Sequence, residues 1–415
     1  MLQELQHSVW RHRDLRLMLS AQAVSAFGDD LALIVLMLRV FSHGLGPWSI
    51  TGLLLCAAVP VACLAPVAGR LVDSVAFRTL ATATAAWQAL CCTALAFAAP
   101  VWSTYALVLA LQIGQVVAGP TWQALLPAVV APDELGSAVS FSQATRQLAA
   151  VAAPAVAGLA VGTVGYTPPL LVDAATFVVL GIAGLGVRTS RVPDASGEEG
   201  AGSSAPFALR SDSLLWPLVV GVCALVLVGG VTNVVEVFLI RGSLAASATV
   251  FGLLAGLFAA ALVAGALAAG KGTADGARAL RAGGAALVVA LALVCGGLAP
   301  TVWAFALAWA VLGIANGALN ADVSTLVLKR APGSFRGRIL ARVNAMVRSA
   351  EIGALAIGGA AGSLLGPRAT FVAGGALMAV VAAGLLFRIQ SQVSARAPRA
   401  SGIWDGQRTW KEERT

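Results

Sequence analysis

Seven ionisable side chains lie well inside long apolar stretches of the sequence, where a charge is costly. A charged side chain at the centre of a membrane-spanning helix costs at least about 2.5 to 3.5 kcal/mol, so such groups are retained for function or are paired. A carboxylate in such a place can bind and release a proton, and we take five of them as candidate proton-coupling groups. These are Asp29, Asp30, Glu236, Asp322 and Glu351, and the candidate buried partners are Arg146 and Arg348.

Sequence spacing leaves the pairing of these groups open. Arg348 and Glu351 are one helical turn apart, so they can neutralise each other as a structural ion pair. Asp29 and Asp30 have no opposite charge near them in sequence, so either one of them carries an exchangeable proton or Arg146 pairs with it from another helix. Consecutive helical residues point about 100° apart, so only one of the two aspartates faces a cavity. We expect it to be Asp29.

Polar side chains recur at helical spacing on four of these stretches. Residues three or four apart share a helix face, so each group forms a polar stripe. The candidate cavity-lining residues are Gln22 and Ser25 on the face of Asp29, Gln112 and Gln115, Asn233 on the face of Glu236, and Asn316 and Asn320. Four such stripes indicate a hydrated, partly polar pathway. Aromatic residues such as Trp303 and Trp309 either stack on a substrate there or face lipid.

The stretches that hold these residues are too long and too apolar for a water-soluble fold. The chain has 415 residues, of which 59% are hydrophobic and 11% charged, whereas soluble proteins carry roughly 25% charged residues. A helix needs about 20 apolar residues to cross a bilayer, and a barrel strand would alternate in polarity over about ten. The runs are apolar on all faces, so we expect an all-α membrane protein with twelve transmembrane helices. The expected spans are 15–41, 48–67, 77–99, 105–130, 138–164, 169–187, 214–240, 246–269, 280–298, 302–328, 339–365 and 369–387.

Positive charges indicate how these spans are oriented. Only Arg39, Arg241 and Arg368 fall in the expected outer loops and two arginines lie in mid-span, so the other 22 of the 27 Lys and Arg lie on the side of the termini. Cytoplasmic loops are the positively charged ones, so we expect a multi-pass protein of the inner (plasma) membrane with both termini in the cytoplasm. We also expect no cleavable signal, because residues 1–16 are polar and basic and the first apolar run is too long.

Composition divides the chain into two halves. Residues 188–213 are rich in Gly, Ser and Glu and cannot bury themselves, which is typical of a linker. We therefore expect an N-terminal six-helix bundle at 1–187, the cytoplasmic linker at 188–213, a C-terminal six-helix bundle at 214–389 and a disordered cytoplasmic tail at 390–415. An internal repeat aligns 124–133 with 324–333. Two six-helix bundles related as parallel repeats explain it.

The loop between the second and third spans carries a motif. Gly69, Leu71, Asp73 and Arg78 match Gly-x-Leu-x-Asp-(Arg/Lys)-x-Gly-Arg-(Arg/Lys), although the other positions depart from it. Here the chain resembles the Major Facilitator Superfamily. The resemblance implies a gating loop in which Asp73 caps the positive end of a helix of the other half, beginning near Ser334. The alternative is a solvated turn.

A second motif narrows the resemblance. Ala153, Pro154 and Gly158 are similar to the antiporter motif Gly-x-x-x-Gly-Pro-x-x-Gly-Gly, with glycines replaced by alanine. Together with 27–29 and 336–338, they resemble the exporter branch that includes macrolide-efflux and enterobactin-export proteins. This implies a secondary active transporter that exports a small lipophilic molecule, such as an antibiotic or siderophore, by alternating access in exchange for protons. Gln112, however, stands where many drug antiporters carry an arginine.

Other classes of function find less support. The formal charge is +8, but the basic residues do not form one patch with interleaved aromatics, so we expect no nucleic acid partner. No P-loop, nucleophile triad or metal-ligand spacing is present in the sequence, so we expect no enzyme activity, cofactor or metal. The expected partners are a small-molecule substrate, protons and the lipid bilayer, with the chain a monomer. The open alternatives are an importer or facilitator and a transporter-like membrane sensor.

Overall fold

The computed structural model describes residues 12–130, 134–189, 215–269, 275–330 and 336–396. Within these ranges it contains twelve long α-helices and no strand, so the all-α prediction is confirmed. The helices are α2 (Arg13–Ser42), α3 (Pro47–Ser74), α4 (Phe77–Phe97), α5 (Val101–Val129), α6 (Leu135–Val164), α7 (Thr167–Gly186), α8 (Leu215–Val237), α9 (Ala248–Ala269), α10 (Asp275–Leu298), α11 (Val302–Arg330), α12 (Arg336–Leu365) and α13 (Pro367–Arg396), and α8 continues into a π-helical turn, η2 (Phe238–Ser243).

Each expected span coincides with one of these helices. Ten of the helices are long and apolar enough to cross a membrane. The two others are α2, which carries Asp29 and Asp30, and α12, which carries Arg348 and Glu351. Large apolar side chains such as Trp303, at 84% exposure, lie on the outside of the bundle. These apolar side chains can lie on the surface because they contact the hydrocarbon core of a lipid bilayer there.

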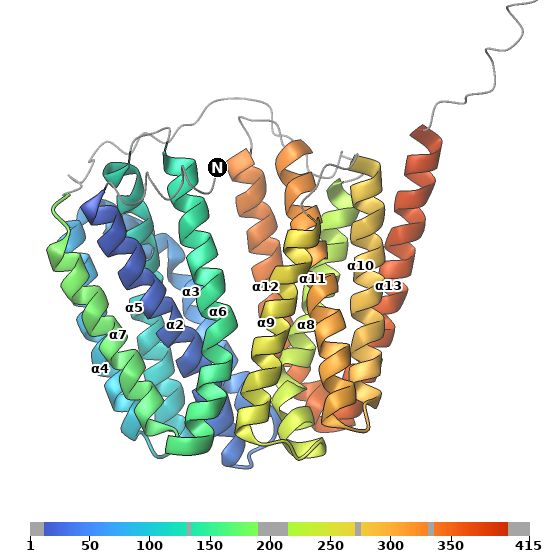
Figure 1. Cartoon of the computed structure of the whole chain (residues 1–415), viewed down its shortest axis with the longest axis horizontal. Helices are drawn as coiled ribbons and strands as arrows, with labels where there is room; N and C mark the ends of the chain where they lie inside the picture. Colours follow the sequence, from blue (N-terminus) through green and yellow to red (C-terminus); the bar gives the residue numbers. More distant parts are fainter. Residues whose placement is uncertain (1–11, 131–133, 190–214, 270–274, 331–335, 397–415) are drawn as a thin grey trace, which may run out of the picture.

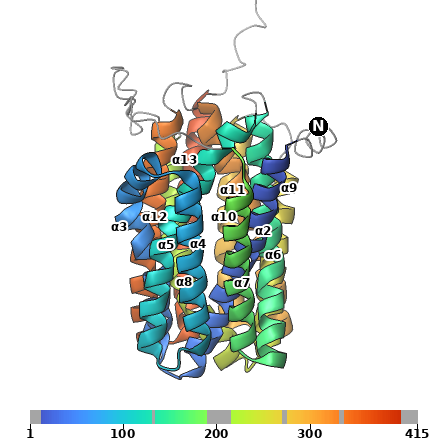
Figure 2. The same cartoon turned by 90° about the vertical axis from the view of Figure 1, so that its left-hand side faces the viewer.

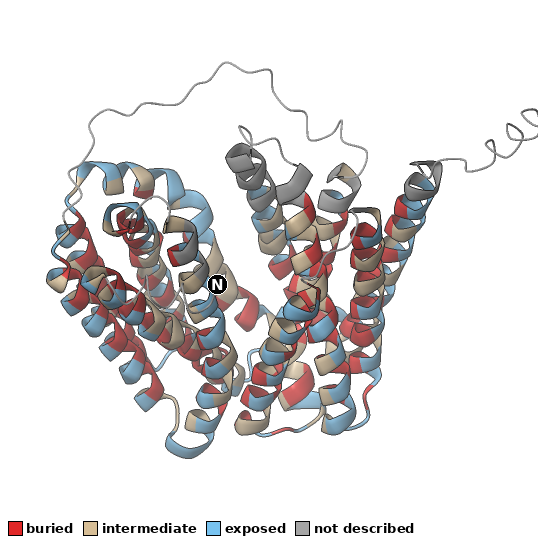
Figure 3. Ribbon diagram, turned by 45° about the horizontal axis from the view of Figure 1, so that its top comes forward, coloured by how far each residue is buried: buried red, intermediate tan, exposed pale blue. Residues whose placement is uncertain are grey.

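The helices form two bundles that stand side by side (Figure 1). Helices α2 to α7 make the N-terminal half and α8 to α13 the C-terminal half, and within the N-terminal half they run along one common direction (Figure 2). Figure 3 shows buried residues inside each half, among them Leu95 and Phe177 in the first and Phe305 and Phe371 in the second. This is the architecture of two six-helix repeats.

Tight turns join the helices at the end of the bundle that lies away from the described chain ends. Gly46, Gly165 and Gly366 have φ values of 76°, 81° and 80°, a backbone region that a side chain disfavours. Proline follows two of them, as Pro47 and Pro367, at the first position of the next helix, where a missing N–H costs nothing. We call this the turn end of the molecule.

The two halves meet close to the turn end along a first seam between α6 and α9. Gly158 and Gly252 bring the two backbones into contact there: a Cβ atom on Gly158 would lie 2.6 Å from the carbonyl oxygen of Ala248, and one on Gly252 would lie 2.7 Å from the Cα of Gly158. Ala153, one turn before Gly158, is completely buried. Small residues allow such close helix approach within a membrane.

A second seam joins α3 to α12 at the same end. The Thr51 hydroxyl donates a hydrogen bond to the carbonyl oxygen of Leu355 at 3.1 Å. A Cβ on Gly359 would lie 2.9 Å from the Trp48 ring, and one on Gly362 would lie 3.0 Å from Pro47. Both seams therefore use small residues near the turn end, so the halves are held together at that end.

Candidate functional site

A cavity of about 700 Å³ lies between the two halves. Its walls are formed by α2, α3 and α6 on one side and by all six helices of the C-terminal half on the other. The two walls differ in chemistry. Among the described residues, the N-terminal wall is apolar and consists of Leu33, Ile34, Met37, Leu54, Ala57, Ala58, Ala150 and Pro154. The polar residues of the described lining belong to the C-terminal half, namely Thr232, Asn233, Glu236, Asn316, Asn320, Arg348 and Glu351.

The expected polar stripes therefore divide between two places. The stripes on α8 and α11 line the cavity, and on α11 the Asn320 amide donates to the Asn316 side-chain oxygen at 3.1 Å. The stripes on α2 and α5 are not part of the cavity lining. Their members are Gln22 and Ser25 on α2 and Gln112 and Gln115 on α5, of which Ser25 is buried.

Contrary to the expectation that it faces the cavity, Asp29 is not part of the cavity lining and faces the interior of the N-terminal half. The Gln115 amide nitrogen donates a hydrogen bond to Asp29 Oδ2 at 3.0 Å, and Gln88 Nε2 donates to Gln115 Oε1. Gln88 is completely buried, and its own Oε1 has no hydrogen-bond partner among the described residues. Three helices, α2, α5 and α4, thus hold one carboxylate through a relay of two amides. Sequence reasoning missed Gln88, although Thr84 precedes it by four residues on the same helix face, because its partner Gln115 lies on another helix.

A second carboxylate, Asp173 on α7, lies in the same half and is completely buried. Its Oδ2 accepts from the Cys92 thiol at 3.2 Å, and its Oδ1 accepts from the Thr176 hydroxyl at 3.2 Å. Gly28 lets α2 pack against this group, since a Cβ there would lie 2.7 Å from Thr176 Oγ1. The charge of Asp173 acts on Asp29, so the two carboxylates form one electrostatic unit. The signal in the sequence is a lone aspartate within an apolar span.

The two arginines that we expected to be buried are instead exposed. The Arg348 side chain is 68% exposed and pairs with Glu351 at 3.0 Å, in the expected one-turn arrangement. Arg348 and Glu351 both line the cavity, which is open to water, so this ion pair does not need to be buried. Arg146 is exposed on α6; among the described residues it forms no ion pair, but its charge acts on both Asp29 and Asp30.

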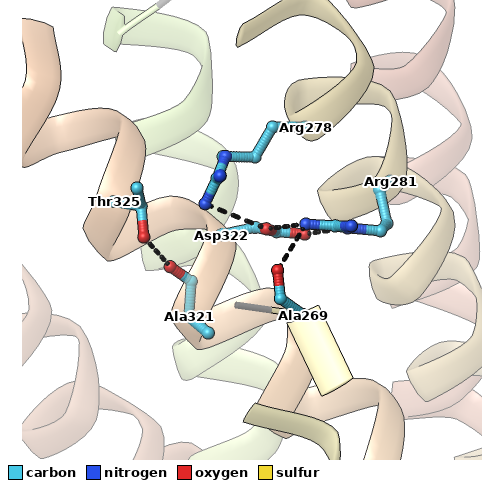
Figure 4. A network of polar contacts seen from close by, with 6 residues as sticks. All are labelled: Ala269, Arg278, Arg281, Ala321, Asp322 and Thr325. Atoms are coloured by element: carbon cyan, nitrogen blue, oxygen red, sulfur yellow. Dashed lines mark hydrogen bonds and ion pairs between the residues drawn. The ribbon is translucent and has the colours of Figure 1, made fainter. Parts of the chain in front are cut away.

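Asp322 lies in an ion-pair network rather than in the cavity (Figure 4). Its side chain is completely buried, and Arg281 binds it through two nitrogens, at 2.7 Å from Nε and 2.5 Å from Nη2. Arg278 approaches it to 3.7 Å, and Arg281 also donates to the carbonyl oxygen of Ala269 at 2.8 Å. The network joins α10 and α11 to the end of α9. Asp322 is therefore poorly placed to exchange protons.

We expect Asp322→Asn to destabilise the C-terminal half, because it leaves the buried Arg278 and the partly exposed Arg281 without a counter-charge. Removing one member of a buried pair costs about 3 to 5 kcal/mol. The yield of monodisperse protein after detergent extraction and the midpoint of thermal unfolding should both fall. Thr325→Ala is the matched control on the same helix, since the Thr325 hydroxyl only donates to the Ala321 carbonyl. Equal stability of both variants would contradict a structural role for this network.

The expected gating loop begins in the last turns of α3. Gly69 and Leu71 lie within this helix, and Asp73 is exposed near its end. The helix start that Asp73 is predicted to cap, near Ser334, lies outside the described residues. The cap therefore stays a prediction.

Arg78 and Asp14 form hydrogen bonds with the chain segment that follows α7. Arg78 donates two hydrogen bonds to the Val187 carbonyl, at 3.2 and 2.8 Å, as suits a cation at a helix C-terminus. The Asp14 carboxylate accepts from the Arg188 amide at 3.0 Å and from the Thr189 amide and hydroxyl at 2.9 and 2.8 Å. Partial burial raises the pKa of Asp14, but these hydrogen bonds outweigh it and leave the pKa below its ordinary value. The hydrogen bonds to the Asp14 carboxylate therefore persist at neutral pH.

The antiporter-like motif lies partly at the cavity and partly at the first seam. Pro154 lines the cavity from α6, whereas Ala153 is buried and Gly158 contacts α9. In the described ranges no group of three or more His, Cys, Asp or Glu side chains is placed to hold a metal ion.

Comparison with known proteins gives two findings. The family model described as Major Facilitator Superfamily matches residues 18–241 and 227–413. Among curated proteins, no match was found. Similar solved structures include a bacterial homolog of the human lysosomal transporter Spinster in an inward-facing and unoccupied conformation, with 13% identity, a TM-score of 0.68 and coverage of 93% of this chain and 98% of that one.

Two further structures extend this likeness of fold. A POT family transporter in complex with 5-aminolevulinic acid has 12% identity and a TM-score of 0.72, with coverage of 92% of this chain and 96% of that one. A bacterial homologue of the iron transporter ferroportin in an inward-facing state has 16% identity and a TM-score of 0.70, with coverage of 92% and 99%. These relatives carry different cargoes on one fold, so the fold alone does not identify a substrate.

Proposed function

Because the chain belongs to the Major Facilitator Superfamily and is thus a multi-pass membrane transport protein, we propose that it exports a small lipophilic organic molecule in exchange for protons. The observation that carries the proposal is the 700 Å³ cavity between the two halves, of which one wall is apolar and the other polar. Cavities of about 300 to 1,000 Å³ suit small organic ligands. An antibiotic, a siderophore or another metabolite of the cell falls in this class.

The way the halves meet supports alternating access as the mechanism. The two seams hold them together near the turn end, where Gly158 contacts α9 and Thr51 binds Leu355. With the termini in the cytoplasm, the turn end faces outward, and the conformation is closed to the outside. Rocking of the halves about the cavity would open the seams and expose the cargo to the other side of the inner membrane.

Proton exchange is assigned to Asp29. The Asp29 carboxylate lies beside the charges of Asp173 and Arg146, and Gln115 holds it in place. Two carboxylates that share a site bind and release protons as a pair, and a nearby arginine influences that exchange. A shift of Arg146 relative to α2 during rocking would therefore change proton affinity. One proton moving down 100 mV supplies about 2.3 kcal/mol.

The test is uptake into everted membrane vesicles from a host that lacks its own efflux pumps. A susceptibility screen with lipophilic antibiotics, macrolides included, first selects a labelled compound. We expect the compound to accumulate when respiration energises the vesicles and to leave on addition of a protonophore, with no accumulation in vesicles without the protein. Protonophore-insensitive equilibration would indicate a facilitator. Binding without any flux would indicate a sensor. Either result overturns the proposal.

A further inference from the structure

Among the described residues, three ionisable side chains line the cavity, two of them acidic and one basic. Arg348 and Glu351 form an ion pair at 3.0 Å and cancel. Glu236 remains, and among the described residues it has neither a hydrogen bond nor an ion pair. The next arginine along the chain, Arg241, instead donates to the carbonyl oxygen of Ala246 at 2.6 Å. Among the described residues of the lining, Glu236 is therefore the one carboxyl group without a cationic partner.

This carboxyl group sits in surroundings that cannot neutralise it. The eight residues of the opposite wall are apolar, and Asn233 and Thr232 on α8 are uncharged. A carboxylate that faces an apolar wall and has no cation of its own is stabilised by a cation that enters the site. Glu236 also lies two residues before the π-helical turn η2, and such turns are frequent at functional sites.

Aromatic side chains favour the same kind of ligand. Trp309 and Phe258 line the cavity with their ring centroids 5.4 Å apart, and Phe305 stacks behind Trp309 at 4.9 Å. A cation within about 6 Å of such a ring is attracted by its π electrons. An anion finds no comparable partner, since the Arg348 guanidinium is occupied by Glu351.

We propose that the cargo is an organic cation with an apolar body and that Glu236 binds its positive charge. The proposal rests on the proposed function, because it takes this cavity as the path of the cargo. The apolar part of the molecule lies against the wall of α2, α3 and α6, and its charged centre lies against α8.

The test compares two probes of nearly the same shape and opposite charge, the tetraphenylphosphonium cation and the tetraphenylborate anion. Binding is measured by titration calorimetry on the full chain in detergent. The wild type should bind the cation more tightly than the anion. Glu236→Gln should weaken cation binding by about tenfold or more, because a charged contact is lost. Glu236→Asp keeps the charge and should retain much of the affinity; both variants are first checked for a monodisperse elution profile.

Glu351→Gln is the matched variant in the same cavity, since it also removes one carboxylate. It frees Arg348 from its pair, so it should increase binding of tetraphenylborate, which Glu236→Gln should do to a smaller extent. Equal cation affinity of the wild type and Glu236→Gln would overturn the proposal. So would preference of the wild type for the anion, which would point to Arg348 as the binding group.

These outcomes are separable from those of the transport assay. Cation binding that depends on Glu236, in a protein without proton-linked flux, would support the inference and overturn the proposed function. Proton-linked efflux of an uncharged or anionic compound, with no tetraphenylphosphonium binding, would overturn the inference and leave the function standing.

Discussion

Asp29→Asn is expected to reduce protonophore-sensitive efflux to the level of empty vesicles while leaving the folded yield unchanged. The asparagine oxygen can still accept the hydrogen bond that Gln115 donates at 3.0 Å, so the packing of α2 against α5 survives. The substituted side chain can no longer bind and release a proton. It also no longer acts on the charge of Asp173. The protein would then bind its cargo without coupling it to the proton gradient.

Two further measurements separate loss of coupling from loss of binding. Asp29→Asn should still exchange labelled for unlabelled cargo across a vesicle membrane without a gradient, because exchange needs only the rocking of the loaded protein. Asp30→Asn makes the same chemical change one residue along, where the structure has no amide relay, and should retain coupling to a greater extent. Wild-type, protonophore-sensitive efflux by Asp29→Asn would show that the proton is carried elsewhere.

The helices could be predicted from sequence because each apolar run is bounded by local signals. Pro47 and Pro367 begin helices at the positions where proline is tolerated, and Gly165 ends one in a left-handed turn. Such signals depend on a few neighbouring residues. The packing of the two halves depends on residues far apart in sequence. Gly252 contacts Gly158, which lies on a helix of the other half.

The candidate site could be predicted only in part, for the same reason. Helical spacing indicates which residues share a face, but not which neighbour that face meets. Asn316 and Asn320 meet the cavity, whereas Gln115 turns toward Asp29 inside the N-terminal half. Asp322 looked unpaired in sequence because its partner, Arg281, is 41 positions earlier on a neighbouring helix.

The comparisons establish the family and the fold of the chain. The family match covers both halves of the chain, and the structural relatives have between 12% and 16% identity. At that distance the shared fold does not identify the cargo. The resemblance to macrolide and enterobactin exporters, which rests on residues such as Pro154 and Gly158, therefore stays a prediction until a cargo is measured.

Gly252→Val is expected to open the molecule at the turn end. A Cβ at this position would lie 2.7 Å from the Cα of Gly158 and 2.8 Å from its nitrogen, and these are backbone atoms that cannot rotate away. This clash is relieved only if α6 and α9 move apart. Their separation weakens the first seam and leaves the polar wall of the cavity unchanged. Overpacking of this kind costs about 1 to 3 kcal/mol. A cost of about 2 kcal/mol, applied only to the closed state, shifts the equilibrium about 30-fold toward the open one.

The shift can be measured as a distance between spin labels on Trp102→Cys and Trp303→Cys, two highly exposed positions near the turn end, one in each half. The exposed native cysteines, Cys63 and Cys295, are replaced beforehand. Gly252→Val should lengthen this distance and slow efflux, because the cycle cannot return to the closed state. Gly119→Val is the matched control, since nothing lies within 4 Å of a Cβ at that glycine. An unchanged distance in Gly252→Val would mean that the seam yields locally and does not determine which side of the membrane the cavity faces.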